Sequence, residues 1–150
     1  MHRDRGMTLT ELIVVVTIMG ILAAVALPRW SGAAIRQRQV EQTVRRLTTD
    51  LRRVRAMALR DAAVNPQGFR LKITGSKGYD LIDLSSNQTV ESYPFPSDAG
   101  FTCSGDMQFD FGPLGNLTDG GGHRVTLSGQ GQTFALTVIP ATGAVLSHEE

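Results

Sequence analysis

The chain has 150 residues, 41% of them hydrophobic, with 15 basic and 14 acidic residues and a net charge of +1. This length suits one compact domain with a modest core and leaves no room for a second large one. The single cysteine, Cys103, excludes a disulfide within the chain and offers no zinc-type spacing, so we expect it to be a buried small apolar residue.

The first predicted element is an apolar run from Met7 to Leu27, in which Glu11 is the only charged residue. As a helix, about 21 residues rise roughly 30 Å, which is the thickness of the hydrocarbon core of a bilayer. The run therefore predicts a membrane helix.

A secretory signal peptide is an alternative interpretation of the same run. Arg3 and Arg5 supply a positive start, residues 24–26 (Ala-Val-Ala) resemble a small-residue cleavage site, and the mature chain would begin at Leu27. Glu11 argues against both simple interpretations, because a carboxylate within a membrane helix is costly and usually has a cationic partner. Beside a buried ammonium it would fix the register of two helices, since only a correctly placed neighbour removes the cost.

The stretch Gly6-Met7-Thr8-Leu9-Thr10-Glu11-Leu12, followed by the apolar run and Pro28, resembles the N-terminal signature of type IV prepilins and type II secretion pseudopilins. In that family a membrane peptidase cuts after the glycine, here Gly6, and the new N-terminus, here Met7, is methylated. The resemblance implies a leader at residues 1–6 and a transmembrane and assembly helix at residues 7–28. It assigns assembly to Glu11, Leu12 and Pro28, and Glu11 would attract the N-terminal amine of a neighbouring subunit.

The resemblance also implies a location and a set of partners. The chain would cross the bacterial inner membrane once, with a cytoplasmic N-terminus and a periplasmic head, and then enter a periplasmic pseudopilus or pilus. Its partners would be prepilin peptidase, the inner-membrane assembly platform, membrane lipid and other pilins or pseudopilins, without a cofactor. Charge alone favours the opposite topology, because the three arginines after the run outnumber the two before it (Arg29, Arg36 and Arg38 against Arg3 and Arg5).

An amphipathic helix is predicted after Pro28. Apolar residues recur there at intervals of three or four, which places them on one face of a helix that packs against a core: Val40, Val44, Leu47, Leu51, Val54 and Ala58. The helix should end near residues 61–65, because Asn65-Pro66-Gln67-Gly68 is a helix-breaking cluster. We expect an amphipathic stem at residues 29–64 that continues the membrane helix.

From residue 65 onward the pattern is typical of strands and turns. Residues 69–74 and 79–84 alternate in polarity and are joined by Gly75-Ser76-Lys77-Gly78, which predicts a hairpin. Further strands are expected at residues 89–95, 107–111, 124–128, 133–139 and 144–147. The predicted fold class is α+β, with a long N-terminal α-helix (membrane segment plus stem) packed against a C-terminal antiparallel β-rich head at residues 65–150.

Two segments with turn residues in the predicted head point to a subgroup of this family. The sequences Phe109-Asp110-Phe111-Gly112-Pro113-Leu114-Gly115 and Pro140-Ala141-Thr142-Gly143-Ala144-Val145 are similar to the head of the GspH and FimT group of minor pseudopilins and minor pilins. That group consists of structural subunits, so the resemblance implies no enzyme activity. The histidines lack metal-ligand spacing, and no nucleophile or phosphate-binding motif is present, so we predict neither a catalytic site nor a metal site.

Charge is divided unevenly along the chain. Residues 29–60 hold nine arginines and two acids, whereas residues 61–150 hold four basic and ten acidic residues. Clustered arginines bind phosphates without sequence specificity, and FimT-like relatives are implicated in DNA uptake. Because the chain ends in Glu149 and Glu150 with no arginine after Gly143, we favour contact with a neighbouring subunit's acidic head over DNA binding. The candidate contact residues are Arg45, Arg46, Arg52, Arg53 and Arg55.

Overall fold

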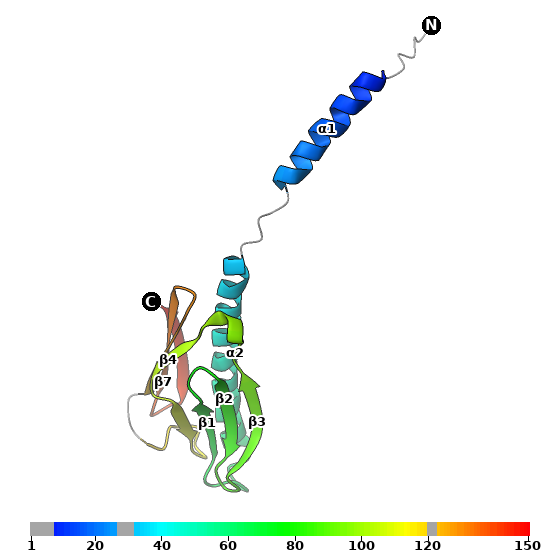
Figure 1. The fold of residues 1–150 in the computed structure, drawn as a ribbon. Helices are drawn as coiled ribbons and strands as arrows, with labels where there is room; N and C mark the ends of the chain where they lie inside the picture. The colour runs from blue at the N-terminus through cyan, green and yellow to red at the C-terminus, as the bar shows by residue number, and fades with distance from the viewer. Residues whose placement is uncertain (1–7, 27–31, 120–122) are drawn as a thin grey trace. The chain divides into compact units, whose positions relative to one another are not determined.

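The computed structural model describes residues 8–26, 32–119 and 123–150. The chain forms two compact units, residues 1–31 and residues 32–150. The first contains helix α1 (Leu9–Ala26), and the second contains helix α2 (Gly32–Arg60) and the strands (Figure 1). Pro28 and the junction between the two predicted helical segments lie outside the described residues.

Helix α1 is apolar on every side. Its 18 residues include one charged residue, Glu11, and its large apolar side chains are exposed, from 37% at Val15 to 75% at Leu9. Within residues 8–26, 32–119 and 123–150, no helix has the combination of length and apolar character needed to cross a membrane.

Helix α2 confirms the predicted amphipathic stem pattern. The six residues of the predicted stripe are between 0% and 3% exposed: Val40, Val44, Leu47, Leu51, Val54 and Ala58. The helix ends at Arg60, next to the predicted end region, and four turn residues follow it. Because apolar residues three or four apart share one helix face, this single stripe provides the surface on which the strands pack.

The strands form two antiparallel sheets that both contact α2 (Figure 1). The first sheet has the order β3-β2-β1-β5 and the second has the order β4-β6-β7-β8. Their bounds are Phe69–Ile73 (β1), Gly78–Asp83 (β2), Gln88–Pro94 (β3), Thr102–Gly105 (β4), Gln108–Phe111 (β5), His123–Gly129 (β6), Gln132–Ile139 (β7) and Ala144–Glu149 (β8). A short 3-10 helix, η1 (Ser97–Ala99), precedes β4. The α+β fold class is confirmed.

The core lies between α2 and the two sheets. Phe109 and Phe111 on β5 are fully buried, as their shared strand face predicts, and Leu71, Leu127 and Leu136 come from strands of both sheets. Cys103 is half-buried at the margin of this core rather than within it. Burial raises the pKa of its thiol above the ordinary value, which keeps the thiol protonated and unreactive.

One close approach fixes how the chain passes from α2 into the first sheet. Gly68 has φ of +81°, and a Cβ at this position would lie 1.9 Å from the carbonyl oxygen of Phe111. Only glycine combines this backbone conformation with such an approach. The Asn65 side chain holds the same turn, since its Oδ1 accepts the Gly68 N–H and its Nδ2 donates to the Gly68 carbonyl, both at 2.9 Å.

The burial of the stripe yields a stability prediction. Leu51 is 0% exposed, so Leu51→Ala should lower the free energy of unfolding by about 2–5 kcal/mol through lost burial and a cavity. Urea unfolding of the full chain in detergent, followed by circular dichroism, measures the change. Leu59→Ala is the matched control on the same helix, because Leu59 is 46% exposed. Equal losses from the two variants would contradict the packing described above.

Candidate functional site

The N-terminal end of α1 brings together Thr8, Thr10 and Glu11. Thr8 immediately precedes the helix, and its Oγ1 accepts a hydrogen bond from the Glu11 N–H at 3.3 Å. The Thr8 carbonyl accepts the Leu12 N–H at 3.1 Å, so Thr8 has the contacts of an N-cap residue. Glu11 stands three positions later, which is the spacing of a capping box, and negative charge in a first turn is favoured by the helix dipole.

The other predicted residues of this site are only partly described. Leu12 lies on α1 with its side chain 54% exposed. Gly6 and Met7, the predicted cleavage and methylation positions, lie outside the described residues, as does Pro28. The N-cap role of Thr8 was not predicted from the sequence, although the Thr-x-x-Glu spacing is typical of such a cap.

Two of the five candidate arginines reach main-chain carbonyls of the β-rich part. Arg52 donates to the Val145 carbonyl at 3.3 Å, and Arg55 donates to the Gly115 carbonyl at 3.2 Å. These bonds join α2 to β8 and to the turn after β5. Both guanidinium groups therefore contribute to holding the helix on the head.

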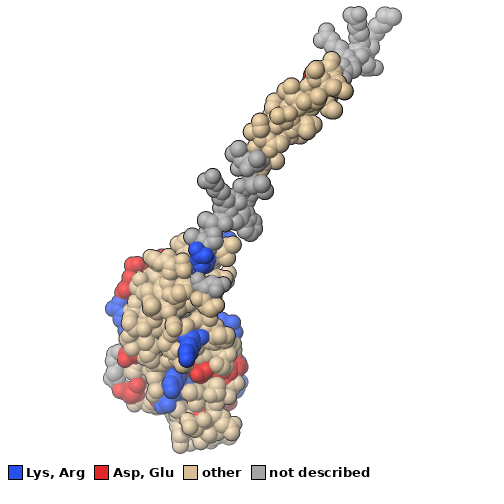
Figure 2. All heavy atoms as spheres, in the orientation of Figure 1, with Lys and Arg blue, Asp and Glu red and all other residues tan. Residues whose placement is uncertain are grey.

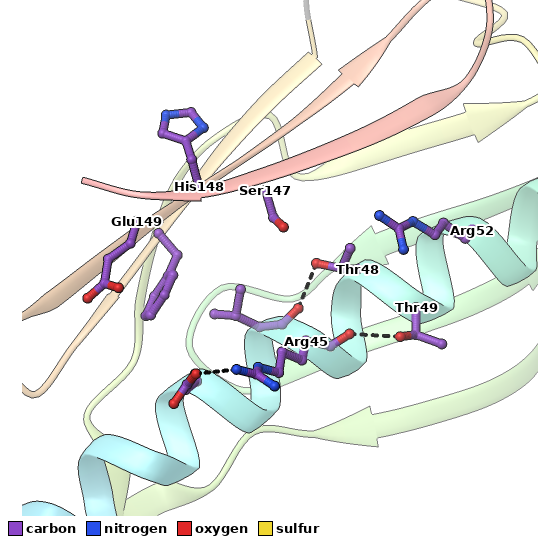
Figure 3. A pocket seen from close by; sticks show the side chains of 10 residues that line it. Arg45, Thr48, Thr49, Arg52, Ser147, His148 and Glu149 are labelled. Carbon is purple, nitrogen blue, oxygen red and sulfur yellow. Dashed lines mark hydrogen bonds and ion pairs between the residues drawn. The ribbon is translucent and has the colours of Figure 1, made fainter.

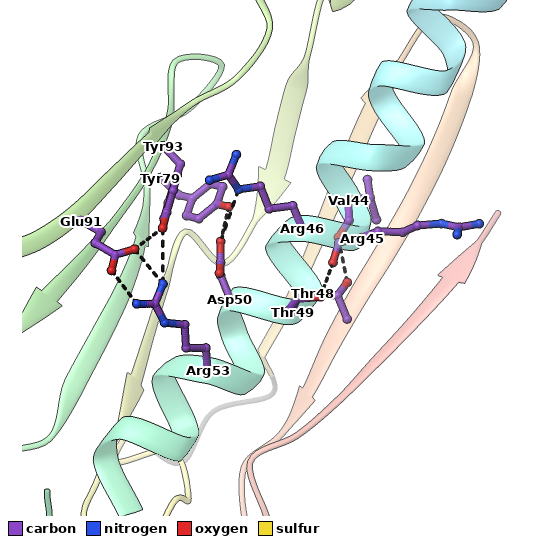
Figure 4. Close-up of polar contacts among 10 residues, drawn as sticks. All are labelled: Val44, Arg45, Arg46, Thr48, Thr49, Asp50, Arg53, Tyr79, Glu91 and Tyr93. Carbon is purple, nitrogen blue, oxygen red and sulfur yellow. Dashed lines mark hydrogen bonds and ion pairs between the residues drawn. The ribbon is translucent and has the colours of Figure 1, made fainter. Parts of the chain in front are cut away.

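The other three candidate arginines have acidic or aromatic partners within the chain, and Figure 4 shows those of Arg46 and Arg53. Arg45 lies 2.5 Å from Glu41 one turn earlier on α2. Arg53 forms two hydrogen bonds with Glu91 on β3, at 2.7 and 2.5 Å, which hold the pKa of that carboxyl below its usual range. Arg46 lies 4.0 Å above the Tyr93 ring and 3.8 Å from Asp50, so Figure 4 shows its head group between β3 and α2.

These pairings change the distribution of charge expected from the sequence. On the face of the β-rich part shown in Figure 2, basic and acidic residues lie close to one another and do not form an uninterrupted basic stripe. Among the described arginines, Arg36 and Arg38 have no partner of this kind, and both are exposed near the start of α2. Uneven charge along the sequence is thus largely neutralised by folding.

A buried polar pair joins α2 to the first sheet. Asp50 is 7% exposed and Tyr79 on β2 is 2% exposed, and the Tyr79 hydroxyl donates to Asp50 Oδ2 at 2.6 Å (Figure 4). Burial, and then this hydrogen bond, raises the pKa of the Tyr79 hydroxyl well above its ordinary value. The burial of Asp50 could have been predicted from the sequence, because Asp50 stands three residues after Leu47 and therefore shares the buried face of α2.

Comparison with known proteins bears on the N-terminal site. Residues 1–27 match the family model described as the prokaryotic N-terminal methylation motif. The chain carries the type IV pilin and pseudopilin signal. No curated protein and no solved structure matches the chain.

The motif bears on how the N-terminal segment is processed and where it is anchored. It implies processing by prepilin peptidase, anchoring in the inner membrane before assembly, and assembly with other pilins. The motif is typical of structural subunits. Within the described ranges, no group of three or more His, Cys, Asp or Glu residues is placed to hold a metal ion.

The buried polar pair yields the second prediction. Tyr79→Phe should lower the free energy of unfolding by about 1–3 kcal/mol at neutral pH, because it leaves the buried Asp50 carboxylate without its hydroxyl donor. The pKa of the Tyr79 hydroxyl is higher in the folded than in the unfolded state. The hydroxyl therefore makes its full contribution to the free energy of unfolding below about pH 10, and this contribution is lost as pH rises further. Urea unfolding at neutral and alkaline pH measures both effects.

Tyr93→Phe is the control for this prediction. Tyr93 also has a hydroxyl partner, Glu91, but that contact is less buried and its loss should cost less. If Tyr79→Phe were as stable as the parent chain and lost as much free energy of unfolding at alkaline pH, the contact with Asp50 would not stabilise the fold.

Proposed function

We propose that the chain is a GspH-like minor pseudopilin, a structural subunit of a type II secretion pseudopilus or of a type IV pilus. The observation that carries the proposal is the match to the N-terminal methylation motif at residues 1–27, with Glu11 in the first turn of an otherwise uncharged helix. The exposed apolar surface of α1 supports it, because neighbouring subunits can bury that surface in a fibre.

Assembly in this proposal proceeds by processing followed by contact. Peptidase cleavage after Gly6 releases the leader and exposes the amine of Met7, which is methylated. The carboxylate of Glu11 on one subunit then pairs with the Met7 amine of its neighbour. Because each charge is costly when buried alone, the pair forms only when two helices are correctly aligned, and apolar contacts along α1 supply the remaining affinity.

The proposed topology places residues 7–28 in the inner membrane, the N-terminus in the cytoplasm and the β-rich head in the periplasm. This segment is longer than α1, since it includes residues beyond both ends of the described helix. The proposed boundaries are a leader at residues 1–6, a stem at residues 29–64 and a head at residues 65–150. The stem and the head are proposed parts of one compact unit, because residues 32–150 hold both α2 and the strands (Figure 1).

The alternative, a FimT-like minor pilin that binds DNA during uptake, has less support. Its candidate contact residues all have partners within the chain, either carboxylates, an aromatic ring or main-chain carbonyls. DNA would have to compete with these contacts for the same guanidinium groups. A structural role does not require phosphate binding, and the contacts within the chain account for the same arginines.

Mass spectrometry tests the processing step. In a host that has prepilin peptidase, the chain recovered from membranes should begin at Met7 and carry one added methyl group. Gly6→Ala should leave the leader attached, whereas Gly20→Ala, at a helix position with open space around it, should be processed normally. A chain that began at Met1 or Leu27 would overturn the proposal.

Fibre incorporation tests the assembly step. Glu11→Ala should be processed but should lose most of its incorporation into sheared fibres, because the neighbour's amine would be buried without a partner. Thr8→Ala is the matched control, since it removes the N-cap oxygen but keeps the carboxylate, and it should still assemble. Normal incorporation of Glu11→Ala would contradict the assigned role.

A further inference from the structure

A groove lies between α2 and the last strand, β8, with a volume of about 400 Å³ (Figure 3). Val44 and Phe134, both largely buried, line its apolar part. Arg45, Thr48 and Arg52 line it from α2, and Ser147 and Glu149 line it from β8. Figure 3 shows the Ser147 hydroxyl directed toward the helix.

The main chain of β8 has a free edge beside this groove. Strand β8 is last in its sheet and pairs with β7 on one side. The Glu150 N–H donates to the Thr133 carbonyl next to the start of β7 at 2.9 Å, whereas the Val145 carbonyl accepts from Arg52 on α2. In an antiparallel pair, successive residues direct their main-chain groups to opposite sides. Ser147 and Glu149 therefore direct theirs away from β7, as Val145 does.

These edge groups have no main-chain partner within the described ranges. No hydrogen bond is found for the N–H or carbonyl of Ser147 or Glu149 on the side away from β7, and both residues are exposed. Arg52 occupies the Val145 carbonyl, so the free part of the edge begins at Ser147. An exposed strand edge of this kind is a template for another extended chain.

The charges beside the edge favour an acidic occupant. The Glu41 carboxylate is already paired with Arg45, and the Glu149 carboxylate accepts a hydrogen bond from Gln132. Arg52 has the Val145 carbonyl as its partner and no carboxylate among the described residues. Its remaining N–H donors fit a carboxylate, which a guanidinium binds in a planar, two-point geometry.

We propose that the free edge of β8 binds an extended segment of a neighbouring fibre subunit as an added strand, with an acidic side chain of that segment on Arg52. The main-chain groups of Ser147 and Glu149 form the ladder, and the groove against α2 accommodates alternate side chains. This mode of recognition is β-strand addition, in which main-chain bonds give affinity and side-chain pockets give specificity. The identity of the partner as a fibre subunit rests on the proposed function.

A peptide-binding experiment tests the site on the isolated full chain in detergent micelles. The probe is a fluorescently labelled, end-blocked peptide, Thr-Val-Glu-Val-Thr, and binding is followed by fluorescence anisotropy. We expect saturable binding that weakens about tenfold or more when the peptide glutamate is replaced by lysine. Methylation of alternate peptide nitrogens should weaken binding as much, because it removes the donors of the ladder without changing the protein.

A matched pair of variants tests the edge itself. Ser147→Pro removes an N–H that β7 does not use, so the fold should persist while binding falls about tenfold or more. Ser147→Ala removes the same hydroxyl but keeps the N–H, and it should bind as the parent does. Arg52→Gln should weaken binding of the glutamate peptide and leave that of the lysine peptide unchanged.

The outcomes separate this inference from the proposed function. No saturable binding by the parent chain, equal binding of the N-methylated peptide, or displacement of the peptide by duplex DNA would each overturn the strand-addition site. None of these results bears on processing at Gly6 or on Glu11. Conversely, peptide binding by a chain that never enters a fibre would leave the edge as a binding site and remove only the fibre subunit as its partner.

Discussion

The packing of the α2 stripe against two sheets is the contact on which the rest of the head depends. Its side chains are almost completely buried, and strands from both sheets contact the same helix. A four-stranded sheet with one apolar face needs a cover, and here one helix covers two such sheets. Loss of volume within the stripe would therefore loosen both sheets, whereas the exposed face of α2 tolerates change.

Polar contacts then fix the orientation of α2 on that core. The Tyr79 hydroxyl and the Arg53 guanidinium tie α2 to the first sheet, while Arg52 ties it to the second. Hydrophobic burial is not directional, but these bonds require particular geometry, so they select one rotation of the helix among several that bury apolar area. The positions of Arg52 and Arg53 on α2 are thus explained by contacts within the chain before any external partner is invoked.

The sequence predicted the elements whose pattern is local and strong. The three-and-four spacing from Val40 to Ala58 and the hairpin at residues 75–78 both correspond to observed structure. Strand β4 was missed, because Thr-Cys-Ser-Gly lacks apolar alternation and is a strand only through its pairing with β6. Strand order and the intrachain partners of the arginines depend on contacts between distant residues, such as Arg53 with Glu91, which no local pattern encodes.

At the N-terminal site, the local sequence pattern suggested a role for Glu11 but did not predict the contacts that begin the helix. The position of Glu11 in an uncharged run indicated a pairing role, but it did not reveal how the helix begins. In the structure the N-cap oxygen comes from Thr8, which accepts the Glu11 N–H. The hydroxyl of Thr8 thus satisfies one of the free N–H donors of the first turn, and the Glu11 side chain is exposed. In the proposed assembly this exposed carboxylate pairs with an amine on another chain, and the dipole of α1 favours its negative charge.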